Sequence, residues 1–364
     1  MNILIFLVIL LVLVLVHEFG HFFSAKKFGI RVDEFGFGFP PKIFGIKRGE
    51  TEYSINALPF GGFVKIFGEN PDEENTNGPD KERSFINKPK WQQAIVLFAG
   101  IFANFLLAWF LFSFGLMSGL PMSTSNEIKG SAFSDVNLVV VSVLPSSPAE
   151  VAGLKPWDKI VSVKSGDGFV ADINPETLKS FITYHGGQEV EIGYLRGEDV
   201  GEIKLIPTVA SSGGNPAIGI AMDQIGLAKL PVLTAFYEGG RLTWSVTKGT
   251  AVGLYTLILE GIRGKGSFAS VTGPVGLVGI VGEAYKFGFA YLMSFTALIS
   301  INLAIINLIP FPALDGGRLF FLLIEKIKGS RISPGVANIA NMAGFFILIA
   351  LMLLVTYHDI AKLL

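Results

Sequence analysis

The stretch His17-Glu18-Phe19-Gly20-His21 lies at the end of an apolar run, residues 3–23. On a helix, residues four positions apart share one face, so the two imidazoles can hold one metal ion while Glu18 lies one step round the helix. Zinc hydrolases use this H-E-x-x-H arrangement, with two nitrogen ligands and a carboxylate that takes a proton from water. The spacing therefore predicts a zinc site with His17 and His21 as ligands.

The apolar run that carries this motif is long enough to cross a membrane. At about 1.5 Å of rise per residue, residues 3–23 cover a hydrocarbon core of roughly 30 Å. Two histidines and a glutamate are costly in such a helix, so their presence indicates a function. The alternative is that these polar residues only cap the inner end of a span. Capping would account for one of them, but hardly for all three at this spacing.

Composition also favours a membrane protein. Half of the residues are hydrophobic, only 16% are charged, and the mean hydropathy of +0.54 is well above that of soluble proteins. The net charge of −1 argues against binding to nucleic acid. The chain has no cysteine, which excludes disulfides, thiol nucleophiles and cysteine ligands. Any metal must therefore be held by His, Asp or Glu.

Charge flanking the apolar runs predicts their orientation. The first run is longer than the apolar core of a secretory signal, follows no basic residue and ends in Lys26-Lys27, so we expect a retained span with these lysines inside. A second span is expected at residues 91–117 and a third at residues 289–309. With four spans in all, the region between the second and third is expected on the outer side of the membrane.

Residues 31–69 are predicted to form β structure. Clusters of glycine and phenylalanine, and an alternating pattern at residues 51–57, favour short antiparallel strands joined by glycine turns. The aromatic content suits a membrane-associated hairpin that enters the inner interface beside the site, and an ordinary soluble hairpin explains it equally well. Residues 70–90 are polar and read as a solvated loop.

Two segments are expected to pack on the membrane part. Gly100 and Asn104 lie four positions apart in the second span, and this face should pack on the first span because a small residue permits close approach and a buried amide can bond across helices. Residues 232–262 resemble an amphipathic helix that lies on the membrane surface and is interrupted by glycines. Residues 270–276 are expected to form a turn.

The region between the second and third spans has the composition of a soluble domain. Strands are predicted at residues 138–143, 159–163, 189–194 and 202–206, with a helix at 175–184. The run Ser147-Pro-Ala-Glu-Val-Ala-Gly-Leu154, followed by Trp157-Asp-Lys-Ile-Val161, resembles the S-P-A-x-x-A-G-L-x-x-G-D-x-I stretch of bacterial protease PDZ modules. Trp157 stands where those modules usually have glycine. PDZ domains bind peptides by strand addition, and a role as a size filter stays open.

A second motif, Asn307-Leu-Ile-Pro-Phe-Pro-Ala-Leu-Asp-Gly-Gly-Arg318, ends the third span. Its two prolines break the helix, and freed backbone at membrane depth is tolerated only where it lines a polar site or packs on protein. Asp315 then begins a new helix, either as a simple N-cap or as the third metal ligand. Catalytic zinc generally takes three protein ligands, and the remaining histidines, His185 and His358, are expected on the outer side.

These motifs together resemble the site-2 proteases, in the bacterial branch that cleaves membrane-anchored anti-sigma factors. The resemblance covers essentially the whole chain, including Thr272-Gly-Pro-Val, with one PDZ-like domain where the best-known enterobacterial members carry two. It implies Zn²⁺ held by His17, His21 and Asp315, with Glu18 as general base and acid. It also implies that Asn307 and Asn302 bond the substrate backbone, and that the hairpin at residues 51–66, including Tyr53 and Ile55, clamps the substrate as an added strand.

The expected architecture is thus a polytopic α-helical membrane protein with about four transmembrane helices, a β-hairpin region and one inserted PDZ-like α+β domain. Residues 1–125 carry the first two spans, 126–212 the PDZ-like domain, and 213–364 the surface helices and last two spans. The expected function is intramembrane proteolysis of single-pass proteins, after a prior extracytoplasmic cut. Two other classes remain open: a non-catalytic membrane-anchored PDZ scaffold, and a transporter with a buried metal or carboxylate site.

Overall fold

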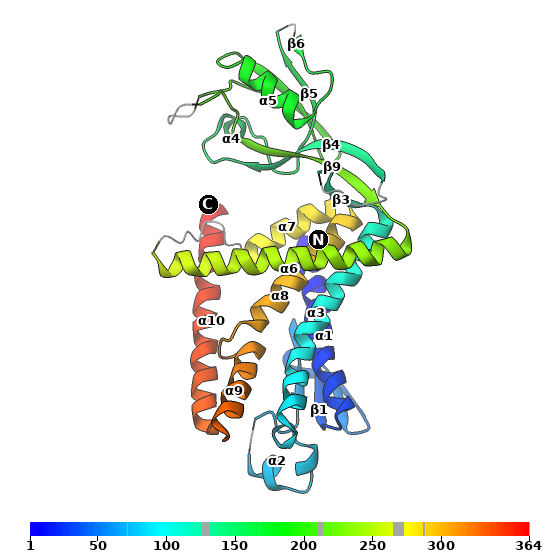
Figure 1. The fold of residues 1–364 in the computed structure, drawn as a ribbon, viewed down its shortest axis with the longest axis vertical. Helices are drawn as coiled ribbons and strands as arrows, with labels where there is room; N and C mark the ends of the chain where they lie inside the picture. The colour runs from blue at the N-terminus through cyan, green and yellow to red at the C-terminus, as the bar shows by residue number, and fades with distance from the viewer. Residues whose placement is uncertain are drawn as a thin grey trace. The chain divides into compact units, whose positions relative to one another are not determined.

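The computed structural model describes residues 1–70, 72–125, 132–166, 168–209, 214–264, 273–286 and 288–363. They form two compact units (Figure 1). The first combines Met1–Ser113 with Phe236–Leu364, and the second is Phe114–Ala235. The second unit is therefore inserted into the first along the chain.

Among the described residues, four helices are long and apolar enough to cross a membrane. They are α1 (Asn2–Lys27), α3 (Lys90–Ser118), α8 (Phe289–Leu308) and α10 (Pro334–Leu363). The first three agree with the predicted spans to within a few residues. These helices, with the β region between α1 and α3, are those of an integral membrane protein, as predicted.

Glycines bring α1 and α3 into direct contact. A Cβ atom added at Gly20 would lie 2.3 Å from the carbonyl oxygen of Ala99, and one added at Gly100 would lie 2.3 Å from Nε2 of His21. Deeper in the same bundle, Ile9 and Leu13 of α1 are buried with Val281 of α7 (Pro274–Lys286). The predicted packing of the Gly100 face on the first span is therefore confirmed.

The β region is one hairpin of two long strands, β1 (Val32–Arg48) and β2 (Thr51–Ile66), and not several short ones. Both strands bend, so residues 34–37 pair with residues 52–55 on one side and with residues 62–65 on the other. Residues 44–48 pair with the far side of residues 51–55. The outer segments of this sheet are thus residues 62–66 and 42–48.

The predicted loop at residues 70–90 is partly ordered. It contains α2 (Glu73–Asn77), η1 (Lys81–Arg83) and η2 (Phe85–Asn87). Phe85 is buried in a cluster with Ile66, Val96 and Leu97, and Leu319 and Leu322 pack against that cluster. The last two belong to α9 (Asp315–Lys328). An apolar cluster therefore joins the hairpin, α3 and α9 on one side of the bundle.

The helix predicted at residues 232–262 forms with those bounds, but the interruption by glycines and the turn at residues 270–276 are not both found as predicted. The helix α6 (Val232–Ile262) is continuous, because glycines at 249, 253 and 261 cost a helix only about 1 kcal/mol each and do not break it. It runs crosswise to α3 and α10 (Figure 1). Of the turn predicted at residues 270–276, residues 270–272 lie outside the described residues, and from Pro274 the chain is helical, in α7.

The second unit is built on one antiparallel sheet of seven strands with two short helices. The strands run in the order β3-β9-β4-β5-β7-β8, with β6 paired to β5. Their bounds are β3 (Leu120–Ser123), β4 (Ala132–Val143), β5 (Lys159–Ser165), β6 (Gly168–Phe169), β7 (Val190–Arg196), β8 (Asp199–Leu205) and β9 (Ile220–Lys229), with helices α4 (Pro148–Val151) and α5 (Pro175–Tyr184). Leu138, Ile160, Leu178 and Ile192 lie in its core.

This unit extends past the predicted limits of 126–212 in both directions. The reason is that β9 pairs with β4 along its length and with β3 at its end, so the sheet is incomplete without either flanking strand. The Gly/Ser-rich run at residues 211–214, which the sequence predicts to be a linker, falls almost wholly outside the described residues. The four predicted strands and the helix at 175–184 all form, as β4, β5, β7, β8 and α5.

Trp157 has a backbone φ of 73°, in the left-handed region that favours glycine. This explains why glycine is usual at this place in the PDZ modules that the sequence resembles. The next residue, Asp158, is fully buried and accepts two hydrogen bonds of 2.7 Å from the Arg196 guanidinium. The bidentate ion pair between Arg196 and Asp158 thus stabilises the chain next to Trp157, whose backbone is strained.

Candidate metal centre

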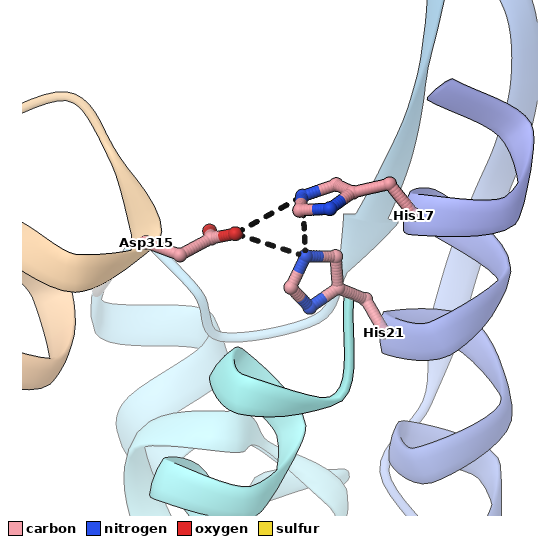
Figure 2. Close-up of side chains that lie close together, drawn as sticks. All are labelled: His17, His21 and Asp315. Atoms are coloured by element: carbon pink, nitrogen blue, oxygen red, sulfur yellow. Dashed lines mark hydrogen bonds and ion pairs between the residues drawn. The ribbon is translucent and has the colours of Figure 1, made fainter. Parts of the chain in front are cut away.

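Three side chains converge at the C-terminal part of α1. Nε2 of His17 lies 3.0 Å from Oδ2 of Asp315, Nε2 of His21 lies 3.3 Å from the same oxygen, and the two nitrogens are 3.2 Å apart. Figure 2 shows the three side chains pointing toward one another, the histidines from α1 and the aspartate from the start of α9. Both histidines are buried, with 8% and 7% exposure.

The donor set fits a metal ion. Nδ1 of His21 lies 2.8 Å from the carbonyl oxygen of Val96, so Nδ1 carries the proton of the neutral ring and Nε2 keeps its lone pair. Within the described residues, Oδ2 of Asp315 is buried without a hydrogen bond. Lone pairs and a carboxylate oxygen at this separation repel one another unless a cation lies between them. Two imidazoles and a carboxylate are a ligand set of catalytic zinc sites.

Asn104 contacts the other histidine, His17. Its side-chain amide lies 3.3 Å from Nδ1 of His17, and the atom placed there is Nδ2, which leaves Oδ1 buried without a partner. The amide oxygen and nitrogen are nearly indistinguishable in shape. With the amide turned over, Nδ1 of His17 donates to Oδ1 of Asn104, and the amide nitrogen Nδ2 takes the position without a partner. That orientation leaves Nε2 of His17 free to bind a metal.

Asp315 does not act as a helix cap. It is the first residue of α9, the N-cap position belongs to Leu314, and no side chain caps the helix. Gly316 and Gly317 pack against the preceding loop, where an added Cβ would come within 2.3 Å of the Ile309 carbonyl oxygen and 2.2 Å of the Phe311 carbonyl oxygen. These contacts fold the loop back on α9, so that the Asp315 carboxylate faces the histidines.

Glu18 lies between α1 and the hairpin. Its carboxylate accepts a hydrogen bond from the backbone N–H of Val64, and its charge acts on His17, His21 and Asp315. A Cβ atom at Gly62 would lie 3.8 Å from its Cγ. Glu18 is therefore close to the three converging residues without being one of them, at the side where the outer hairpin segment, residues 62–66, runs past α1.

The other predicted site residues are not drawn into this cluster. Asn302 and Asn307 lie on α8, partly buried, and no hydrogen bond or ion pair described for the structure joins either to the three ligands. Tyr53 and Ile55 lie in an inner segment of the hairpin, where Tyr53 pairs with both Phe35 and Ile46. Their backbone therefore offers no free edge for an added strand, and their role in substrate binding stays a prediction.

The comparison with known families decides the assignment. A model of the family described as Peptidase family M50 matches residues 5–351. This chain belongs to peptidase family M50. The M50 peptidases are the site-2 proteases, so the resemblance seen in the sequence is confirmed.

Relatives of this M50 peptidase agree. A Clostridium perfringens protein, named provisionally as a zinc metalloprotease, is 36% identical over 96% of this chain and 95% of its own length. Zinc metalloprotease RasP of Oceanobacillus iheyensis is 28% identical over 97% of both chains. Protease RseP of Yersinia pestis is 28% identical over 98% of both. The chain is a zinc metalloprotease, and Zn²⁺ is its expected cofactor.

The contact between Gly100 and His21 leads to a first prediction. In Gly100→Ala, the new methyl group overlaps an imidazole that is held by its bond to Val96, so we expect zinc affinity to fall by at least about tenfold. Titration of the purified protein with zinc measures this. Gly249→Ala is the matched control, since nothing lies within 4 Å of a Cβ atom there. Equal zinc affinity in the two variants would contradict the prediction.

Proposed function

We propose that this chain hydrolyses peptide bonds within transmembrane segments of membrane-anchored proteins, such as anti-sigma factors, after an earlier cut on the extracytoplasmic side. The observation that carries the proposal is a metal-ligand triad on apolar, span-length helices beside the free edge of a sheet. Site-2 proteases act on membrane proteins, which supports the substrate class. The anti-sigma-factor substrates, the order of cleavage and the inner-membrane location belong to the proposal.

We assign the ligands as His17, His21 and Asp315, and Glu18 as the proton carrier. A zinc ion bound there supplies a Lewis acid that polarises the scissile carbonyl and acidifies water. Glu18 accepts a proton from the attacking water and delivers it to the leaving amine. Val96 and Asn104 orient the two imidazoles. An amide donor such as that of Asn307, with Asn302 less directly, would bond the substrate backbone at the reacting carbonyl.

The hairpin supports a way to present the substrate. A transmembrane helix hides its peptide bonds in its own hydrogen bonds, so it must be extended before cleavage. Residues 62–66 pair with β1 on one side only, and Val64 within them bonds Glu18. A substrate strand added to this edge would replace its lost helical bonds and run past the proton carrier. We therefore move the strand-addition site from Tyr53 and Ile55 to residues 62–66.

The surface of the hairpin supports its place in the membrane. Ile43, Phe44, Ile46, Ile55 and Leu58 are each between 47% and 69% exposed. A water-facing hairpin would place polar side chains at these positions, whereas lipid favours apolar ones. Of the two interpretations left open by the sequence, we favour the hairpin that enters the membrane interface.

The second unit supports a PDZ-like role on the extracytoplasmic side. Residues 220–223 of β9 pair with β4 on one side, while β3 covers the other side only at residues 225–228. A peptide could add to the uncovered part of β9, as PDZ ligands do. A shortened substrate ectodomain would be held or admitted there. Faster cleavage of a substrate with a shortened ectodomain than of the intact one tests the proposed order of cuts.

The direct test of the function uses the purified protein in liposomes with a single-span model substrate. We expect about one zinc per chain, and cleavage sites that mass spectrometry places inside the apolar segment. A chelator should stop cleavage, and added zinc should restore it. The absence of bound zinc would favour a scaffold or a transporter and overturn the proposal.

The proposed topology predicts which introduced cysteines a membrane-impermeant thiol reagent can reach. Lys26, Lys27, Lys88 and Lys90 flank the first two spans, so the second unit should lie outside and the α9 to α10 turn inside. Because the chain has no cysteine, Ser165→Cys and Ser330→Cys each give a single thiol. In intact cells we expect labelling of Ser165→Cys alone, and in permeabilised cells labelling of both. The reverse pattern in intact cells would overturn the topology.

A further inference from the structure

Arg318 and Glu69 form an ion pair close to the metal ligands. Arg318 lies one turn after Asp315 on α9, and its guanidinium contacts the carboxylate of Glu69, which follows β2. The two side chains are 32% and 20% exposed. The charge of Glu18 also acts on Arg318, so the pair lies near the ligand site.

Two ion pairs fix α9 along its length. The first is Arg318 with Glu69, near the start of the helix, and the second is Lys90 with Glu325, near its end. Glu325 also accepts a hydrogen bond of 2.9 Å from the backbone of Ile332. Leu319 and Leu322, between the two pairs, pack on the apolar cluster below the hairpin. The helix α9 is thus attached to its surroundings by two ion pairs and by the apolar contacts between them.

Backbone contacts set the path of the chain around Asp315. Gly316 and Gly317 pack on the preceding loop, and Asn341 accepts a hydrogen bond from the Ala313 N–H. The helix N-terminus has no side-chain cap. The lateral position of the carboxylate therefore also depends on how the first turn of α9 is attached to the hairpin, and among the ion pairs described Arg318 with Glu69 makes that attachment. Placement matters, because an error of about 1 Å at a catalytic group can cost on the order of 10²-fold in rate.

Glu69, the other partner, is itself fixed to the hairpin. Its backbone N–H donates to the carbonyl oxygen of Ile66, at 3.2 Å, and Ile66 is the last residue of the outer segment 62–66. The preceding Phe67 donates to Arg31 and accepts from Phe85. The ion pair thus connects the third metal ligand to the same segment that offers a free strand edge.

From this connection we infer that Arg318 is a positioning residue, which through Glu69 holds Asp315 at metal-binding distance from His17 and His21. The inference rests on the proposed function. It assigns Arg318 a role that the second ion pair, Lys90 with Glu325, does not have. Both pairs join α9 to other segments of the first unit. The difference is distance along the helix: Arg318 lies three residues from Asp315, and Glu325 lies a further seven residues on.

A cavity with polar side chains in its lining makes this inference testable. Glu69, Arg318, Gln93 and Glu325 line a cavity of about 100 Å³, and Oε1 of Gln93 has no partner among the described residues. A volume of this size holds a few water molecules. Removal of the Arg318 charge would therefore leave Glu69 facing water and not hydrocarbon. The fold should survive the substitution.

The experiment compares Arg318→Met with Lys90→Met in the full-length protein. We expect Arg318→Met to lower zinc affinity about 10- to 100-fold, the usual effect of an outer-shell partner. Cleavage of a model transmembrane substrate at saturating zinc should fall about 100-fold. Lys90→Met should stay within about threefold of wild type in both assays, with a similar melting temperature. Equal behaviour of the two variants would overturn the inference and leave both pairs as structural ties.

Charge reversal gives the second arm. Glu69→Arg alone should weaken zinc binding, and Glu69→Arg combined with Arg318→Glu should restore zinc affinity to within a few fold of wild type. A double variant as weak as the single one would contradict the inference. Zinc affinity is measured without substrate, so it decides the role of Arg318 by itself. A wild-type protein that binds zinc and cleaves no transmembrane substrate would overturn the proposed function alone.

Discussion

Replacement of Glu18 by glutamine should abolish cleavage and leave zinc bound. Glutamine keeps the size of the side chain but cannot accept a proton from water, and general acid–base catalysis is typically worth 10²- to 10⁴-fold in rate. Glu18 contacts Val64 and lies beside the ligand triad, not in it. We therefore expect a rate loss of at least about 10³-fold in a liposome assay, with about one zinc per chain by elemental analysis.

Glu260→Gln is a matched control for the Glu18 variant, because Glu260 is exposed on α6. It removes the same charge from the same unit and should leave both the rate and the zinc content at wild-type values. Normal turnover by Glu18→Gln would remove Glu18 from the mechanism. Loss of zinc from that variant would instead make Glu18 part of the ligand set.

Asp315→Asn should lower zinc affinity by orders of magnitude. The change removes a negatively charged oxygen from a site whose two other ligands are neutral imidazoles. A helix cap would tolerate it, since asparagine caps about as well as aspartate. The structure already argues against a cap, because Leu314 takes the N-cap position. Zinc titration and proteolysis of the purified variant measure the effect, with a melting curve to show that it folds.

Two results would count against Asp315 as a ligand. One is retention of both zinc and activity in Asp315→Asn, which would leave the third ligand unidentified. The other is an equal loss of zinc in a variant of His358 or His185, which lie outside the cluster of potential ligands found among the described residues. A lowered melting temperature without loss of zinc would indicate a structural role only.

The metal site was predictable from the sequence because two ligands lie within one helical turn and the chain offers few candidates for the third. The separation of His17 and His21 matches the helical repeat, so the chain itself puts them on one face. Asp315 followed from the absence of cysteine and the scarcity of histidine, which left few candidates inside the membrane. Asn104 was predicted only as a packing residue, because no sequence pattern around it shows that its amide contacts Nδ1 of His17.

Strand partners were not predictable in the same way. Alternation of side chains shows which residues share a face, but not which strands pair. The sequence thus gave no sign that residues 34–37 lie inside the hairpin sheet, or that β9 joins β3 and β4. The helix α7 was missed because its glycines at 276, 279 and 282 suggest turns.

The inserted second unit has a consequence for chain length. His21 and Asp315 come from the two segments of the first unit, so a bound ion closes a loop that contains the whole of residues 114–235. The entropy of closing a loop rises only with the logarithm of its length, by about 0.6 kcal/mol for each doubling. Residues added to the second unit therefore lower the stability of the metal-closed loop very little. The alignment with the Yersinia pestis protease extends over 452 positions, against 364 residues here, as such tolerance allows.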